Sequence, residues 1–404
     1  MAKRKISRNV VALGLVSFFT DLSSEMIIPV VLPLFMKAQG IAFPVIGLIE
    51  GVAESTASLL KLVSGWLSDR LGKRKALVAI GYGVSTVAKP LFAVAGVWWH
   101  FLAIRFSERI GKGIRTAPRD ALVAASAAEG TRGVSFGLHR ALDTAGAFMG
   151  LLSALVLVWV LKMEPQDFRL LFVIAFIPAL VAVLLVILFV REATPPAGED
   201  TAGEARAGGR LGPQFKWYLL IAGLFTLGNS SDAFLVLRAD AVGFSAPFVI
   251  MLMLVMNAVE AVLATPIGSL SDRVGRKPIL AGAFLVYAAV YFGLAFVGGK
   301  AWLWPLFAVY GVYYAMAEGG FRAMVADLAP ANVRGLAYGL FHLVVGLAAV
   351  PASVIMGWLW DRVGVQYAFS FGAALAFVAM VLLLAVIRVP KPAAAGAITE
   401  VRQG

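Results

Sequence analysis

The ten-residue sequence GWLSDRLGKR at residues 65–74 returns as GSLSDRVGRK at residues 268–277, an offset of 203 residues. We call these two segments the hinge repeat. Each copy follows a long apolar run and precedes another. A short polar segment that recurs at the same place in both halves of a hydrophobic chain indicates a duplicated membrane protein with two equivalent halves.

The composition supports a membrane protein. Of the 404 residues, 60% are hydrophobic and only 14% are charged, so most of the surface is expected to face lipid. At roughly 20 residues per span, the chain accommodates about twelve transmembrane helices. The net charge of +12 lies in short clusters such as 73–75 and 276–277. This spacing fits helix orientation and acidic lipid headgroups rather than nucleic acid.

We therefore predict an all-α membrane protein with twelve transmembrane helices in two pseudo-symmetric six-helix bundles. The absence of cysteine excludes disulfides, thiol catalysis and cysteine-based metal sites. The expected domains are an N-terminal bundle (1–190), a cytoplasmic linker (191–215), a C-terminal bundle (216–390) and a cytoplasmic tail (391–404). The expected spans are 9–35, 45–67, 75–97, 99–125, 134–161, 168–190, 216–238, 246–268, 278–298, 301–326, 335–360 and 366–388.

Lysine and arginine gather in the loops after the even-numbered spans. The positive-inside rule then places both termini in the cytoplasm and the chain in the cytoplasmic membrane. The apolar run from Val10 to Phe35 is too long for a signal peptide and contains Asp21 and Glu25. We expect it to remain as the first span.

Three motifs resemble the major facilitator superfamily of twelve-span bacterial transporters. The hinge repeat is similar to its most specific motif, between spans 2 and 3. Residues 109–117 (RIGKGIRTA) look like its span-4 motif. Residues 146–150 (GAFMG) are similar to its span-5 antiporter motif, with Leu151 in place of the usual proline. The resemblance covers the full chain and implies secondary active transport.

The hinge repeat is expected to work as a conformational latch. Gly65 and Gly72 allow close helix approach and a tight turn. Asp69 can sit against a helix N-terminus, which the resemblance implies is that of span 11. Arg70 and Arg74 can pair with a carboxylate at the end of span 4, or with lipid phosphate.

The two copies differ in that partner. Asp327 is available to Arg273 or Arg276, whereas its counterpart in the first half is Ala125, which leaves only Glu129 as a substitute. The predicted latch comprises Gly65, Asp69, Arg70, Gly72, Arg74, Gly268, Asp272, Arg273, Gly275, Arg276 and Asp327.

The fourth span carries a broad stripe of charge at helical spacing, from Arg105 to Asp120. Charged groups at membrane depth almost always face a bundle interior or a wet cavity. The predicted substrate and proton cavity comprises Asp21, Glu25, Glu54, Arg109, Lys112, Arg115, Arg119, Arg140, Asp143 and Asp232. Structural ion pairs are expected instead at Glu50, Lys61, Lys89 and Glu260. His139 and His342 are too isolated to form a metal site.

The residues favour proton-coupled transport of a small polar or amphiphilic solute, and the resemblance to the superfamily implies export. No nucleotide-binding motif occurs, so an ion gradient or the solute's own gradient must supply the energy. Asp21, Glu25 and Asp143 are candidate proton carriers, and the arginines suit a solute with anionic or zwitterionic groups. We expect a small-molecule substrate, lipid contacts, a monomer, and no cofactor, metal or enzymatic activity.

Three alternatives remain open. Asp21 and Glu25, one helical turn apart, could chelate a divalent metal for export, as in iron exporters of the same superfamily. The chain could take up an organic anion. It could also be a non-transporting membrane receptor or assembly factor, although such proteins generally need a larger soluble part than residues 191–214 offer.

Overall fold

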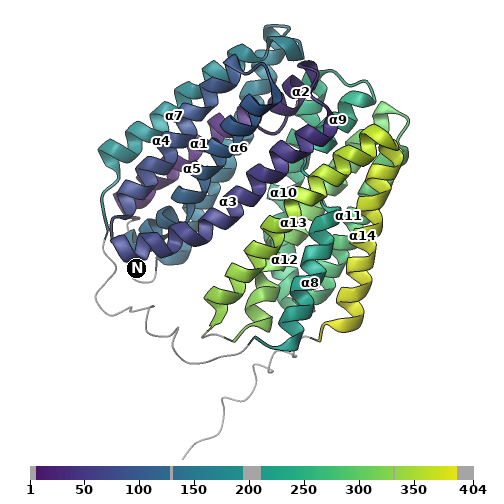
Figure 1. The fold of residues 1–404 in the computed structure, drawn as a ribbon. Coiled ribbons are helices and arrows are strands. Elements are labelled where there is room, and N and C mark those ends of the chain that lie inside the picture. The colour runs from purple at the N-terminus through teal and green to yellow at the C-terminus, as the bar shows by residue number, and fades with distance from the viewer. Residues whose placement is uncertain (1–5, 128–130, 194–210, 331–332, 389–404) are drawn as a thin grey trace, which may run out of the picture.

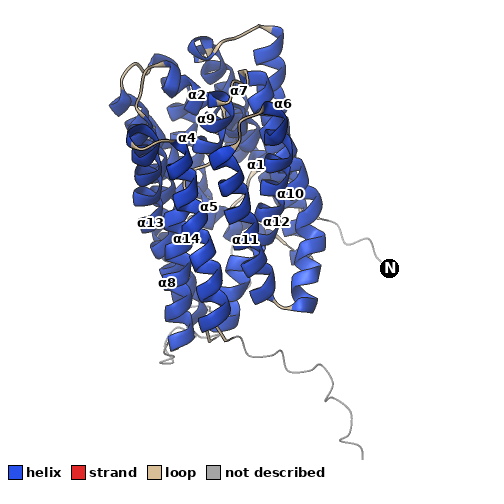
Figure 2. Ribbon diagram, turned by 90° about the vertical axis from the view of Figure 1, so that its right-hand side faces the viewer, coloured by secondary structure: helices blue, strands red, loops and turns tan. Residues whose placement is uncertain are grey.

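The computed structural model describes residues 6–127, 131–193, 211–330 and 333–388, and all regular structure within them is helical (Figure 2). The predicted all-α fold is confirmed. Residues 194–210 and 389–404, which hold most of the expected linker and all of the expected tail, lie outside the described residues.

Twelve expected spans correspond to fourteen α-helices, because two spans are broken. The first half contains α1 (Arg8–Ile27), α2 (Val31–Ala38), α3 (Phe43–Leu71), α4 (Arg74–Leu91), α5 (Trp98–Ser126), α6 (Arg132–Val160) and α7 (Arg169–Phe189). The second half contains α8 (Pro213–Gly228), α9 (Ala233–Ala241), α10 (Ala246–Val274), α11 (Arg276–Phe296), α12 (Leu303–Leu328), α13 (Arg334–Arg362) and α14 (Val365–Val386).

Ten of these spans are long and apolar enough to cross a membrane. The other two are α5, with 29 residues, and α12, with 26 residues. Both have the length to cross. The polarity of α5 comes from its charged stripe, which is therefore the feature that the fold has to accommodate.

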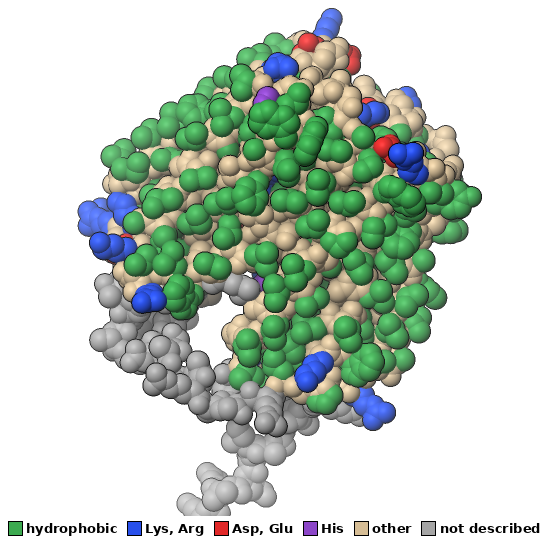
Figure 3. Space-filling view, viewed as in Figure 1, with side chains coloured by type: hydrophobic (Ala, Val, Ile, Leu, Met, Phe, Trp, Pro, Cys, Tyr) green, Lys and Arg blue, Asp and Glu red, His purple; other side chains and the backbone are tan. Residues whose placement is uncertain are grey.

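The helices form two bundles that lie side by side, one from α1 to α7 and the other from α8 to α14 (Figure 1). The face where α7 ends and α8 begins is called the linker face here. The short helices α2 and α9 lie at the opposite face (Figure 1). The outer surface of both bundles carries many hydrophobic side chains, and the two bundles part toward the linker face (Figure 3).

The first span of each half is interrupted, although continuous helices were expected over 9–35 and 216–238. In the first half, α1 ends at Ile27 and α2 begins at Val31, on either side of Pro29. In the second half, Asn229 leaves the helical region (φ −93°, ψ 84°), and Asp232 is the N-cap of α9. Irregular backbone at membrane depth persists where it is buried in protein or lines a cavity.

The two bundles touch closely where α3 crosses α13. A Cβ on Gly47 would collide with the backbone carbonyl of Ser353, and one on Gly51 would come within 2.8 Å of the Cα of Val350. Gly357 makes the reciprocal approach to the backbone of Phe43. Small residues of this kind let transmembrane helices pack backbone to backbone. This contact closes the molecule toward the face opposite the linker.

Candidate functional site

A cavity of about 630 Å³ lies between the two halves and takes its lining from both. The first half contributes α1, α3 and α5, and the second half contributes α10, α12, α13 and the break between α8 and α9. Of the ten residues predicted for a cavity, five line it: Glu25, Glu54, Arg109, Lys112 and Asp232.

On the wall from the first half, α5 is joined to α3 by alternating charges. Arg105 pairs with Glu50 at 2.8 Å and with Glu108 at 2.8 Å. Arg109 pairs with Glu54 at 2.6 Å and approaches Glu108 at 3.5 Å. Arg105 and Glu108 are each 1% exposed, so the network is almost dry at its centre. Breaking such a network by removing one member is costly, because it leaves an uncompensated buried charge.

This network changes the interpretation of the arginines. They were expected to attract an anionic group, but glutamates of α3 and α5 already bind both Arg105 and Arg109. The cavity lining contains five carboxylates and three cationic groups. Lys112, the third cation, forms no ion pair with the described residues. The charges of these two arginines are therefore already compensated within the protein.

The opposite wall is built on the break between α8 and α9. Asp232 accepts hydrogen bonds from the hydroxyls of Tyr310 at 3.0 Å and Tyr314 at 2.5 Å. Ser230 bonds the hydroxyl of Tyr291 at 3.1 Å, and Asn229 donates to that of Tyr313 at 3.3 Å. The polar groups released by the break are thus held by tyrosines from α11 and α12.

Asp21 and Asp143 lie outside the lining of this cavity, contrary to expectation. Their side chains lie close to each other, and Ser17 donates to Asp143 at 2.5 Å. Arg119, also outside the lining, reaches Ser17 at 3.3 Å. These groups form a second polar cluster between α1, α5 and α6. Counting residues along each helix had placed these groups at the right depth in the membrane. It had wrongly assigned them to the side of their helices that faces the cavity.

Arg115 and Arg140 were also predicted to line the cavity, and both lie outside its lining. Arg115 is buried between α4 and α5, where it donates to Ser85 at 2.6 Å and lies 4.5 Å from the ring centre of Tyr82. These contacts join α5 to α4. Arg140 lines a different pocket of about 470 Å³, nearer the linker face, together with Gly268, Asp272 and Arg276 of the second hinge copy.

The family model of the Major Facilitator Superfamily matches residues 13–348 and, in a second match, residues 218–403. The chain belongs to this superfamily. An MFS-type transporter of Methanocaldococcus jannaschii is 37% identical over 390 residues, which cover 94% of this chain and 95% of that protein. The multidrug resistance protein MdtH of Salmonella paratyphi B is 24% identical, covering 83% of this chain and 82% of its own.

Solved structures of the superfamily share the fold. The nucleoside transporter NupG aligns with a TM-score of 0.74 at 13% identity, covering 93% of this chain and 98% of its own. A bacterial homologue of the lysosomal transporter Spinster aligns with a TM-score of 0.71 at 16% identity, covering 93% and 94%. At these identities the likeness supports the fold and not the substrate. Together with the cavity, the family membership makes this chain a membrane transporter.

The superfamily hinge behaves as a turn in both copies. Gly72 and Gly275 have positive φ angles, of 62° and 96°, at the end of α3 and α10. Glycine adopts this conformation without the penalty that a Cβ would add. Gly65 was expected to permit close helix approach, yet its added Cβ would lie an ordinary 3.6 Å from Ala117, and one on Gly268 would meet open space. Close approach at these two glycines is absent from this conformation.

The predicted carboxylate partner of the second hinge copy is present. Arg276 pairs with Asp327 at 2.6 Å and also donates to the carbonyl of Ala323 at 3.0 Å. Asp272 and Arg273 are exposed. Because Arg276 begins α11 and Asp327 lies in α12, this pair joins two helices of the same bundle. It does not join one half to the other.

The first hinge copy has a different partner, which the sequence did not indicate. Glu192, just beyond α7, accepts hydrogen bonds from the backbone N–H groups of Arg74 at 3.1 Å and Lys75 at 2.9 Å. A carboxylate at a helix N-terminus satisfies free donors and complements the helix dipole. Arg70 lies over the ring of Trp66. The side chain of Asp69 and the whole of Glu129 lie outside the described part of the chain.

Several lining residues were missed. Glu50 and Glu260 were assigned to structural ion pairs, yet both line the cavity, and Glu50 does so while bound to Arg105. The tyrosines of α12 were not predicted to belong to the site. Their spacing of three and four residues, at 310, 313 and 314, could have placed them on one helix face.

Proposed function

We propose that this chain exports a small polar or amphiphilic solute from the cytoplasm, in exchange for protons, by alternating access. The observation that carries the proposal is the central cavity, which has a charged wall from one half and a carboxylate and hydroxyl wall from the other. Secondary transporters of this architecture bind substrate near the midplane, between the two repeats. In this proposal the linker face is cytoplasmic, and the chain lies in the cytoplasmic membrane with both termini inside.

Two features support export with protons. The printed names of two relatives describe multidrug efflux: the pump PmrA of Streptococcus pneumoniae, which matches 33% of this chain at 29% identity, and the resistance protein MdtH. Within the chain, the carboxyl groups of Asp21 and Asp143 lie side by side, and two carboxyl groups so close together do not both ionise readily, which favours a proton on one of them. We assign the proton exchange to this pair, which lies apart from the substrate cavity.

The alternatives have less support. For metal export, the described residues contain no group of three or more His, Cys, Asp or Glu side chains placed to hold a metal ion. That alternative rests on Asp21 and Glu25 alone, and Asp21 is engaged with Asp143. Organic-anion uptake is opposed by the pairing of Arg105 with Glu50 and of Arg109 with Glu54, which occupies the two arginines of the lining.

The test is proton movement driven by solute. Purified protein is reconstituted into vesicles that contain a pH-sensitive dye, an outwardly directed solute gradient is imposed, and the dye reports proton entry. We expect proton flux with at least one solute of a chemically broad panel. Asp21→Asn and Asp143→Asn are expected to remove the flux while solute binding persists, and Asp361→Asn, an exposed carboxylate at the end of α13, is the control. Solute movement without proton flux would refute the coupling.

A further inference from the structure

We propose that Lys112 couples the proton site to the solute cavity, as a positioning residue whose ammonium group moves between Asp21 and the cavity. This inference rests on the proposed function, because it explains how a proton on the pair of Asp21 and Asp143 acts on a solute that binds elsewhere. Asp21 and Asp143 lie outside the lining of the cavity, so exchange needs a group that reaches both places.

The first argument is the course of α5, which passes from the wall of the cavity to the proton site. Arg109 and Lys112 line the cavity, and Arg119 reaches Ser17, the residue that donates to Asp143. Spacings of three and seven residues put Arg109, Lys112 and Arg119 on one side of the helix. At about 1.5 Å per residue, Lys112 lies about 5 Å along the axis from Arg109 and about 10 Å from Arg119.

The second argument is that Lys112 is not held in place. The lining contains three cationic groups, and two of them, Arg105 and Arg109, are fixed by ion pairs to glutamates of α3. Lys112 forms no ion pair within the part of the chain that the structure describes, and the residue is partly exposed. Lysine carries its charge on a flexible four-carbon stem. Lys112 is therefore the cation of the lining that can change position.

The third argument is the set of charges that act on Lys112, which lie on both sides of it. Asp21 attracts it toward the proton site, and Glu25 and Glu54 attract it toward the cavity. Among the cations around Asp21, Lys112 exerts the strongest attraction. A proton on Asp21 cancels the attraction toward the proton site and leaves the attraction toward the cavity. The other charged groups that face Asp21 or Lys112 are Asp143 of α6, Lys89 of α4, Glu108 and Arg109 of α5, and Lys61 of α3.

These attractions define two positions of Lys112. When Asp21 takes up a proton from water, an O–H bond forms on its carboxyl group, and the ammonium of Lys112, which keeps its own protons, turns to the cavity. There it competes with the solute for the polar groups of the lining. When Asp21 returns the proton to water, the O–H bond breaks and the carboxylate draws Lys112 out of the cavity. Proton and solute then exclude each other, as exchange requires.

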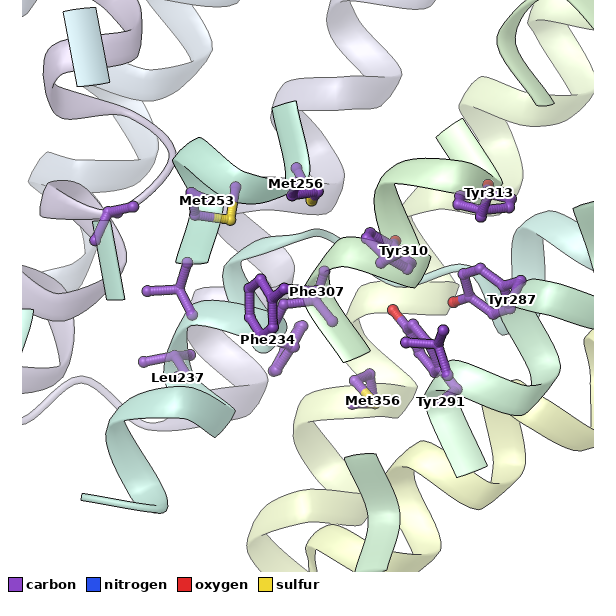
Figure 4. Close-up of a cluster of buried hydrophobic side chains, with 14 of the residues drawn as sticks. Phe234, Leu237, Met253, Met256, Tyr287, Tyr291, Phe307, Tyr310, Tyr313 and Met356 are labelled. Atoms are coloured by element: carbon purple, nitrogen blue, oxygen red, sulfur yellow. The ribbon is translucent and has the colours of Figure 1, made fainter. Parts of the chain in front are cut away.

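The cavity also offers a place from which the position of Lys112 can be measured. Met253, Met256 and Tyr313 line it from the second half, carry no charge and lie in the interior of that half (Figure 4). Charges act more strongly in such surroundings than in water. Asn257, next to Met256 on α10, also lines the cavity, and the chain has no cysteine. Asn257→Cys therefore supplies a single thiol whose reaction rates with anionic and cationic reagents report the local potential.

The test compares the labelling of Asn257→Cys by sulfonatoethyl and trimethylammonioethyl methanethiosulfonate in purified full-length protein, without solute or gradient. Alkaline buffer is used, in which carboxyl groups ionise. Asp21→Asn imitates the protonated carboxyl group, so it should release Lys112 into the cavity and favour the anionic reagent. We expect Asp21→Asn to raise the ratio of the anionic to the cationic rate about threefold more when Lys112 is present than in Lys112→Met. An equal rise in both backgrounds would overturn the proposal, because loss of the Asp21 charge alone would then explain it.

Further variants separate this role from a structural one. Lys112→Arg keeps the charge and should keep most of the dependence on Asp21. Lys112→Gln takes the place of Lys112→Met if thermal unfolding shows that the latter does not fold. Asp361→Asn should leave the ratio of the two rates unchanged. A purely structural role of Lys112 would alter the stability of the protein but not the dependence of this ratio on Asp21.

Failure of this inference can be distinguished from failure of the proposed function. If the ratio depends on Asp21 only when Lys112 is present, but no solute drives proton flux in vesicles, the movement of Lys112 stands and proton-coupled export is wrong. If a solute drives proton flux while Asp21→Asn acts equally with and without Lys112, the transport proposal stands and the role of Lys112 is wrong.

Discussion

Lys37 and Asp240 form an ion pair between the two halves at the face opposite the linker, and they are 203 residues apart in the sequence. This separation equals the offset of the hinge repeat. The two residues therefore occupy equivalent positions in the two copies, at the ends of the equivalent helices α2 and α9. The duplication therefore placed a residue of the first half next to its counterpart in the second half. The opposite charges of Lys37 and Asp240 make this contact attractive.

Lys37→Glu should favour the conformation that opens toward this face. The pair is partly exposed, so its loss together with the new repulsion is worth about 1 kcal/mol, or roughly a fivefold change in the populations. Because the chain has no cysteine, Asn257→Cys places a single thiol in the cavity. Its labelling by a membrane-impermeant maleimide from the face opposite the linker should rise in Lys37→Glu.

Adding Asp240→Lys to that variant should restore the original labelling, because the swapped pair is again attractive. Lys162→Glu makes the same charge change on an exposed loop residue after α6 and should have no effect. If the swapped pair labels like the single variant, the two charges do not act as a pair.

Gly47→Ala should open the same face for a different reason. The added methyl group would collide with the backbone carbonyl of Ser353 and push α3 away from α13. Labelling of Asn257→Cys from the face opposite the linker should therefore increase. Gly83→Ala, where an added Cβ meets nothing within 4 Å, is the matched control. It should be neutral or slightly stabilising, by up to about 1 kcal/mol from helix propensity.

Arg105→Met should reduce the free energy of unfolding by about 3–5 kcal/mol, because it leaves Glu50 and Glu108 without this cation in a nearly dry site. The double variant Glu50→Leu with Arg105→Met should be markedly more stable than the single one, since Glu108 still has Arg109 nearby. Chemical denaturation in detergent micelles measures both. Equal destabilisation of the single and double variants would show that lost packing, not an unpaired charge, is the cause.

Tyr310→Phe should destabilise the protein by about 1–3 kcal/mol, because it removes a hydrogen bond to the carboxylate of Asp232. Tyr82→Phe is the matched control, because it also removes a buried tyrosine hydroxyl. The hydroxyl of Tyr82 is buried without a partner among the described residues, while its ring faces Arg115. Removing that hydroxyl should leave thermal unfolding unchanged or raise its midpoint.

The fold could be predicted from the sequence because the length of the hydrophobic runs and the hinge repeat can be recognised along the chain, without knowing how the helices pack. Both survive in the structure, with Gly72 and Gly275 at the turns. The helix breaks were not predicted. Pro29 stands in one of them, and the other follows Gly228 with the loop-forming residues Asn229, Ser230, Ser231 and Asp232, so both breaks had a local signal that was overlooked. What the local sequence does not reveal is that the second break is also held by hydrogen bonds to tyrosines far along the chain.

The site was only half predictable because counting residues along a helix gives depth but not direction. Glu54 and Arg109 were expected at related depths, and they pair across α3 and α5. Asp21 lies one turn from Glu25 on α1, yet it meets Asp143 of α6 while Glu25 reaches the cavity. Which neighbour each side chain meets depends on how the helices pack, and this is a property of the whole bundle.

The charged stripe of α5 also has a consequence for how the protein is made. Each charged residue near the centre of a lone helix opposes its insertion into the bilayer by about 2.5–3.5 kcal/mol. The ribosome completes α3 before α5, so Glu50 and Glu54 are already delivered when Arg105 and Arg109 arrive. The order of these two helices along the chain thus supplies the counterions first, and α5 enters the membrane as a partner of α3 instead of as an independent segment.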